Sequence, residues 1–132
     1  MSSQRLERVL VVEDDPDIQA IVCISLRVFG RLIVGEASSG EEALEKARTF
    51  APDMILLDVM MPGMDGPATL RGLRGNPDTA GIPIIFLTAK ALPDEMDELR
   101  QLGALHVLVK PFDPLALSEE LDSVWRRYQG ER

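Results

Sequence analysis

The chain has 132 residues, of which 45% are hydrophobic and 27% are charged, which is the size and composition of one folded domain. Its 22 acidic and 14 basic residues give a net charge of −8, which opposes non-specific binding to nucleic acid or to anionic lipid. Cys23 is the only cysteine, so an internal disulfide and a cysteine-rich zinc site are excluded. Without a signal peptide or an apolar run of membrane-spanning length, we expect a soluble, cytoplasmic protein.

The first half of the chain predicts two strands, each followed by a helix. Residues 9–12 form an apolar run that indicates a buried strand, and Asp15-Pro16 predicts the start of a helix that ends at Gly30. A second strand is expected over residues 32–34, before a helix that opens on the capping-box pattern at Ser39. Helical spacing leaves Cys23 off the core face of the first helix. That face is assigned to Ile18, Ile21, Val22, Leu26 and Phe29.

The second half continues the same alternation. Residues 54–57 predict a third strand, and a helix is expected to begin at Asp65. Residues 82–87 predict a fourth strand, followed by a helix that begins near Pro93, carries Leu102 on its core face and ends at Gly103. A last strand over residues 106–109 precedes a helix that is expected to open at Asp113.

Five strands alternating with five helices predict an α/β fold, with one open parallel sheet covered by helices on both faces. The strands are near-continuous apolar runs, which is typical of parallel strands buried on both sides. In such sheets, functional groups gather at the carboxyl ends of the strands. The residues that follow each predicted strand are therefore the candidates for a functional site.

Acidic residues follow two of these strands. The first ends in Glu13-Asp14-Asp15 and the third ends in Asp58. If the strands are neighbours, each pair of carboxylates about 4 Å apart repels by on the order of 4 kcal/mol at an effective dielectric of about 20. Oxygen ligands without Cys or His favour a hard cation, Mg²⁺ or Mn²⁺. The alternative is a set of solvated loop acids and helix caps, and Asp15 is expected to be a cap.

A hydroxyl and an ammonium group follow the fourth and fifth strands, at Thr88 and Lys110. A hydrogen-bond donor and a positive charge beside a metal site are suited to hold a phosphoryl group. Alone, each residue is more simply a strand-end hydroxyl or a solvated charge. Their shared position at strand ends, together with the acids, favours a common site.

Four motifs in order resemble the receiver domain of bacterial two-component response regulators. They are Val-Val-Glu13-Asp14, Leu-Leu-Asp58 with Met-Pro62, Leu-Thr88-Ala89 and Val-Lys110-Pro111. The resemblance covers nearly the whole chain, about residues 8–128. It implies a flavodoxin-like sheet of strand order 2-1-3-4-5, a cis peptide before Pro111, and a single receiver domain over residues 1–132.

The resemblance also implies a role for each site residue. Asp58 would accept a phosphoryl group from a phosphohistidine on a sensor histidine kinase or a histidine-phosphotransfer protein. Mg²⁺ or Mn²⁺ would be held by Glu13, Asp14, Asp58 and the backbone carbonyl of Met60. Lys110 and Thr88 would contact the phosphoryl oxygens. The protein would catalyse its own phosphorylation and dephosphorylation only, and would not be an enzyme with a separate substrate.

The chain ends soon after the last predicted helix, so we expect a stand-alone, chemotaxis-regulator-like switch or relay intermediate. It would have no output domain and would act through an unknown output protein, without direct contact with nucleic acid or membrane. The alternatives are a receiver excised from a larger hybrid kinase or regulator, and a scaffold that works without phosphorylation. A flavodoxin-type flavin protein is disfavoured because Glu13-Asp14-Asp15 would repel the phosphate of the flavin. An aspartate-based hydrolase is disfavoured because Met60 stands where such an enzyme needs a second acid.

Two further features concern signalling partners. Val107 stands three residues before Lys110, where the family usually has an aromatic residue that turns inward when the threonine at the position of Thr88 moves. We therefore expect that phosphorylation is transmitted weakly through the surface of the fourth helix, fifth strand and fifth helix. His106 is expected to point to the opposite side of its strand. On the first helix, Ala20, Ile24 and Val28 form an apolar flank, and Ile24 is the candidate contact for a histidine-phosphotransfer partner. The alternative is packing at the core edge.

Overall fold

The structure is a computed structural model, and it describes residues 4–90 and 92–130. Its centre is one sheet of five parallel strands in the order β2-β1-β3-β4-β5, which confirms the predicted fold and strand order. Every strand begins within about two residues of its predicted position. The strands are β1 (Arg8–Val12), β2 (Ile33–Ala37), β3 (Met54–Asp58), β4 (Ile84–Thr88) and β5 (His106–Val109).

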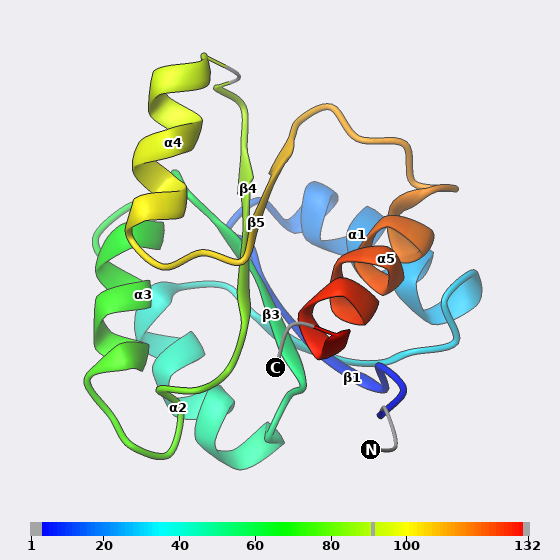
Figure 1. Ribbon diagram of the computed structural model, residues 1–132, viewed down its shortest axis with the longest axis horizontal. Helices are drawn as coiled ribbons and strands as arrows, with labels where there is room; N and C mark the ends of the chain where they lie inside the picture. The colour runs from blue at the N-terminus through cyan, green and yellow to red at the C-terminus, as the bar shows by residue number, and fades with distance from the viewer. Residues whose placement is uncertain (1–3, 91, 131–132) are drawn as a thin grey trace.

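Five helices cover the two faces of this sheet. Helices α1 and α5 pack on one face, and α2, α3 and α4 lie on the other (Figure 1). Helices on both faces are expected when the strand order reverses, as it does here at β1, because parallel strand–helix–strand units almost always cross over with the same hand. The helices are α1 (Pro16–Val28), α2 (Gly40–Phe50), α3 (Gly66–Arg74), α4 (Pro93–Gln101) and α5 (Leu117–Gly130). Among the described residues, none of these helices is both long and apolar enough to cross a membrane.

The core consists of two apolar layers, one on each side of the sheet. All five residues of β3 and of β4 are buried, as expected for central parallel strands. Val107 is buried in the layer under α2, α3 and α4, whereas Leu108 belongs to the layer under α1 and α5. His106 points toward α5, where its Nε2 atom lies 3.5 Å from Glu120 Oε2, so the predicted alternation along β5 is confirmed.

The predicted core face of α1 is partly wrong. Ile21 is 48% exposed and Phe29 is 54% exposed, whereas Cys23 is buried in the core at 1% exposure. The face that meets both the sheet and α5 is therefore rotated toward Val22, Cys23 and Leu26. Burial raises the pKa of the Cys23 thiol to about 12, so this side chain stays protonated and acts as a small apolar residue.

Element boundaries differ from the prediction at three further places. Strand β2 continues through Gly35 and Glu36 to Ala37, because backbone pairing with β1 holds residues that lack an apolar pattern. Helix α5 begins at Leu117 rather than at Asp113, whose carboxylate instead accepts from the backbone N–H of Leu115 in a turn. On α4, Leu102 follows the last helical turn and is 39% exposed, so its predicted place in the core is also wrong.

Candidate functional site

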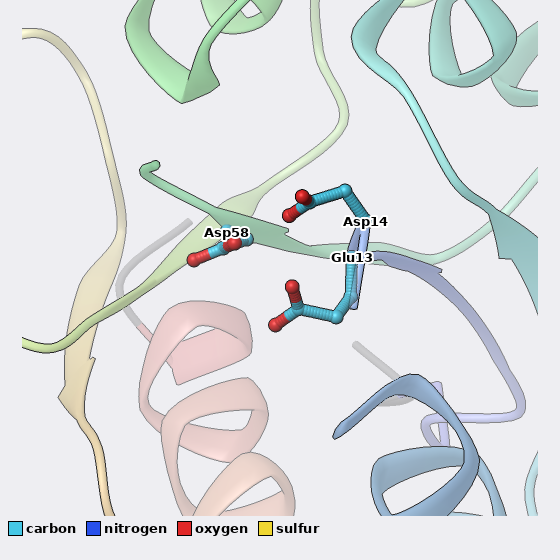
Figure 2. Close-up of side chains that lie close together, drawn as sticks. All are labelled: Glu13, Asp14 and Asp58. Atoms are coloured by element: carbon cyan, nitrogen blue, oxygen red, sulfur yellow. The ribbon is translucent and has the colours of Figure 1, made fainter. Parts of the chain in front are cut away.

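Three carboxylates meet at the carboxyl ends of the neighbouring strands β1 and β3. Glu13 and Asp14 follow β1 directly, and Asp58 is the last residue of β3. Each offers one oxygen atom, and these three atoms lie within 4.8 Å of one another. In Figure 2 the three side chains converge on one small region. We call Glu13, Asp14 and Asp58 the acidic cluster.

The acidic cluster is buried on one side and open on the other. Glu13 is 1% exposed and Asp58 is 3% exposed, whereas Asp14 lies at the surface. Asp15 does not belong to the cluster, because its carboxylate accepts hydrogen bonds from the backbone N–H groups of Asp17 and Ile18. It is the N-cap of α1, as predicted.

Lys110 brings a positive charge into the acidic cluster from the end of β5. Its Nζ atom lies 3.0 Å from Glu13 Oε1 and 3.1 Å from Asp58 Oδ1. The Lys110 backbone N–H donates to the carbonyl oxygen of Thr88 at 2.7 Å, and the peptide bond to Pro111 is cis, as the resemblance implied. This ammonium group offsets the repulsion between two of the three carboxylates.

Burial and pairing shift the proton affinities of Glu13 and Lys110. Burial, together with the side-chain hydrogen bond to Asp58, raises the pKa of Glu13 from 4.5 to about 7, although Lys110 opposes this shift. Burial alone would lower the pKa of Lys110, but its hydrogen bonds to Glu13 and Asp58 outweigh that effect, and its pKa is raised. The site therefore favours the charged form of Lys110 and disfavours the charged form of Glu13.

Thr88 ends the strand between those of Asp58 and Lys110. It is buried, and its hydroxyl oxygen accepts a hydrogen bond of 3.1 Å from the backbone N–H of Lys90. The structure thus places Thr88 at the same edge of the sheet as the acidic cluster, with its oxygen held by the loop that follows β4.

The loop after β3 carries Met60, whose side chain is 61% exposed. Two backbone bonds anchor this loop, from the Val59 N–H to the Leu87 carbonyl at 3.0 Å and from the Gly66 N–H to the Val59 carbonyl at 2.9 Å. A Cβ atom at Gly66 would lie 2.6 Å from the Asp58 carbonyl oxygen, so only glycine lets α3 begin this close to the site. That the Met60 carbonyl binds a metal stays a prediction.

The donor set of the acidic cluster fits a hard divalent cation. Three carboxylates converge, no Cys or His lies among them, and one ammonium group cannot balance all of their charge. Sequence reasoning predicted these acids and Lys110 but did not predict that Lys110 bridges Glu13 and Asp58. It also missed Gln19 on α1, whose side-chain nitrogen donates to the backbone carbonyl groups of Glu13 and Ala37, because nothing in the sequence signals contacts with backbone carbonyls.

Comparison with known families gives one match that covers most of the chain. The model described as the response regulator receiver domain matches residues 9–122. Among curated proteins, the chain is 38% identical over 129 residues to the DNA-binding response regulator MtrA of Mycolicibacterium smegmatis, covering 95% of this chain and 53% of that protein. It is 37% identical over 123 residues to the Bacillus subtilis alkaline phosphatase synthesis transcriptional regulatory protein PhoP, covering 92% and 49%. The chain thus spans about half the length of the curated relatives that it matches.

Solved structures of response regulators also resemble this chain, over nearly the whole length of the solved chains. The chemotaxis response regulator CheY4 of Vibrio cholerae superposes with a TM-score of 0.83 at 34% identity, covering 90% of this chain and 98% of that one. A putative response regulator from Chloroflexus aurantiacus gives 0.83 at 32% identity, covering 93% and 100%.

Proposed function

Because the chain belongs to the response regulator receiver domain family, we propose that it accepts a phosphoryl group on Asp58 and acts as a phosphorylation-dependent switch or relay intermediate. The observation that carries this proposal is the constellation at one sheet edge. A buried carboxylate, Asp58, lies close to two further acids and to a lysine, and a threonine ends the adjacent strand. Neither a plain helix cap nor a solvated loop needs this arrangement.

We infer that the acidic cluster, helped by the Met60 carbonyl, holds Mg²⁺ or Mn²⁺. When bound, the cation would reduce the negative charge that a phosphoryl donor meets and would stabilise the charge of the transferring group. Asp14 suits this role because it is the exposed acid of the cluster, on the side from which an ion enters.

The remaining residues would orient and stabilise the phosphoryl group. One Asp58 oxygen would form the new bond to phosphorus while the bond from phosphorus to the donor nitrogen breaks, and the electron pair stays on the departing imidazole. Lys110 would exchange its hydrogen bond with Asp58 for one with a phosphoryl oxygen. The Thr88 hydroxyl would donate to another once it turns away from the Lys90 backbone. We expect self-dephosphorylation as the only other reaction, with no separate substrate.

We propose that the phosphohistidine donor docks beside α1. A hollow of about 460 Å³ lies between α1 and the segment after β5, and Ile18, Ile21, Lys110 and Phe112 are among its lining residues. Lys110 belongs to both the hollow and the site, so a donor seated there would reach Asp58. On the outer face of α1, Ile24 is 58% exposed and Val28 is 63% exposed, in agreement with the apolar flank predicted from sequence.

We propose two candidates for the output of the switch, that is, for what the phosphorylated protein acts on. The two curated relatives described above are named as a DNA-binding response regulator and a transcriptional regulatory protein, and this chain matches only about half of each. A role as the receiver part of a regulator that binds DNA through another segment is therefore a second candidate beside a stand-alone protein that acts on a cytoplasmic partner.

Intact-mass measurement with two donors tests the proposal. With Mg²⁺ and acetyl phosphate, the wild type is expected to gain one phosphoryl group, and Asp58→Asn is expected to gain none. With a phosphohistidine protein as donor, Ile24→Lys is expected to slow transfer at least about tenfold, or ~1.4 kcal/mol, because a buried Lys would oppose docking.

Two controls make the result specific. Ile24→Lys should react with acetyl phosphate at the wild-type rate, and Ile33→Lys, which changes an exposed apolar residue of β2, should leave both reactions unchanged. A phosphoryl gain in Asp58→Asn would move the acceptor elsewhere. No gain in the wild type would favour a scaffold that works without phosphorylation.

A further inference from the structure

Gln19 lies on the inner flank of α1 and binds two backbone carbonyl groups at once. Its side-chain nitrogen donates to the Glu13 carbonyl at 3.1 Å and to the Ala37 carbonyl at 3.0 Å. A side-chain amide nitrogen has two N–H groups, so both of its donors are used. These bonds join the start of α1 to the ends of β1 and β2.

The two carbonyl groups lie on either side of the first acid of the site. The backbone N–H of Glu13 itself donates to the Ala37 carbonyl at 3.0 Å, so that oxygen accepts from both Glu13 and Gln19. The Glu13 backbone is thereby held through its N–H by β2 and through its carbonyl by α1. The peptide between Glu13 and Asp14 cannot rotate without breaking the bond to Gln19.

This restraint matters because the acids that it positions repel one another. Lys110 pairs with Glu13 and Asp58, but Asp14 forms no ion pair within the part of the chain that the structure describes. A loose loop would relieve the repulsion by turning Asp14 outward. A fixed peptide keeps Asp14 beside the other two carboxylates even in the metal-free protein.

We propose that Gln19 is a positioning residue that fixes the Glu13–Asp14 peptide and so raises the affinity of the acidic cluster for a divalent cation. The inference rests on the proposed function, since it assumes that the cluster binds Mg²⁺. Groups that orient metal ligands from outside commonly change metal affinity by 10–100-fold when they are removed. Gln19 would act in this way through the backbone of its ligands.

Calorimetric titration of the metal-free protein with Mg²⁺ tests the proposal. Gln19→Met keeps the length and neutrality of the side chain but has no donor, and its Mg²⁺ dissociation constant is expected to rise about tenfold. In amide NMR spectra, the Asp14 signal is expected to broaden or move in the metal-free variant. Gln19→Asn, one methylene shorter, is the second variant if Gln19→Met folds poorly, and its Mg²⁺ affinity should fall in the same direction.

Ser25→Ala is the matched control on the same helix. The buried Ser25 hydroxyl donates to the carbonyl of Pro114, so this change also removes a bond from α1 to a loop but leaves the acids untouched. It should lower the thermal midpoint, as Gln19→Met does, while its Mg²⁺ affinity stays within about twofold of wild type. Equal Mg²⁺ affinities for wild type and Gln19→Met would overturn this inference alone. A wild type that binds no Mg²⁺ would overturn both this inference and the proposed metal site.

Discussion

At the scale of single residues, the site combines groups whose positions follow from sequence with contacts that do not. Asp58 and Thr88 end their strands, and Glu13, Asp14 and Lys110 come directly after theirs. The rule that parallel strands gather functional groups at their carboxyl ends was enough to bring these five residues together. The sequence contained no signal that Lys110 would bridge Glu13 and Asp58, because rotamers and burial decide that contact. The hydrogen bonds from Gln19 to two backbone carbonyl groups could not be predicted from the sequence for the same reason.

The raised pKa of Glu13 predicts that the metal-free protein becomes less stable as the pH rises. Its pKa is about 7 in the folded protein and 4.5 ordinarily, so between these values the folded state binds more protons than the unfolded state. The stabilising contribution is complete below about pH 4.5, falls as the pH rises, and is lost above about pH 7. Because one pKa unit corresponds to about 1.4 kcal/mol, we expect a loss of ~1–3 kcal/mol.

Urea unfolding without Mg²⁺ at about pH 5 and about pH 8 measures this effect, and Glu13→Gln is the matched control. The variant carries a neutral isostere at position 13, so most of the pH dependence between these values should disappear. An identical decline in wild type and variant would assign the dependence to another group. The same titration implies that Mg²⁺ affinity increases over this pH range, since proton and cation compete for Glu13.

At the scale of secondary structure, the central elements were more predictable than those at the edges. Strands β3 and β4 are buried on both sides and appear in the sequence as unbroken apolar runs. Strand β2 is held by backbone pairing on one side only and includes Gly35 and Glu36, so its pattern predicted little more than its start. The core face of α1 was misassigned because α1 packs against both the sheet and α5. A single stripe of apolar residues at helical spacing predicts burial against one partner and not against two.

The exposed edge of β2 is covered by two basic side chains. Ile33 and Ala37 bond toward the β1 side, so the alternating residues Val34 and Glu36 turn their carbonyl groups outward. Arg27 donates to the Val34 carbonyl at 3.1 Å, and Lys46 donates to the Glu36 carbonyl. Cationic side chains on an edge strand discourage pairing with a strand of another molecule.

Removing both cations is therefore expected to promote self-association through β2. The Arg27→Ala/Lys46→Ala variant should associate about tenfold more tightly than wild type, or ~1.4 kcal/mol, in sedimentation velocity across a concentration series. Arg48→Ala/Arg71→Ala is the matched control, because it removes the same charge from α2 and α3 and leaves the β2 carbonyl contacts in place. If both variants associate equally, net charge and not the strand edge would be responsible.

At the scale of the whole molecule, the negative charge and the acidic cluster make stability depend on cations in two separable ways. Any salt screens the repulsion that accompanies a net charge of −8, and this effect depends on ionic strength alone. A bound divalent cation stabilises only the folded state, because unfolding separates Asp58 from Glu13 and Asp14, which lie far away in sequence. The two effects are distinguished by comparing Mg²⁺ with Na⁺ at equal ionic strength.

Mg²⁺ at about 100 times its dissociation constant is expected to raise the free energy of unfolding by ~2.7 kcal/mol, which is measurable as a higher urea midpoint at unchanged slope. Na⁺ at the same ionic strength should give a much smaller rise. Asp14→Asn should keep or exceed the metal-free stability of wild type, since it removes an exposed charge that repels Glu13 and Asp58, but it should lose most of the Mg²⁺ response. If Asp14→Asn and wild type gain equally from Mg²⁺, the ion binds outside the acidic cluster, and the chemistry proposed for Asp58 would have to proceed without it.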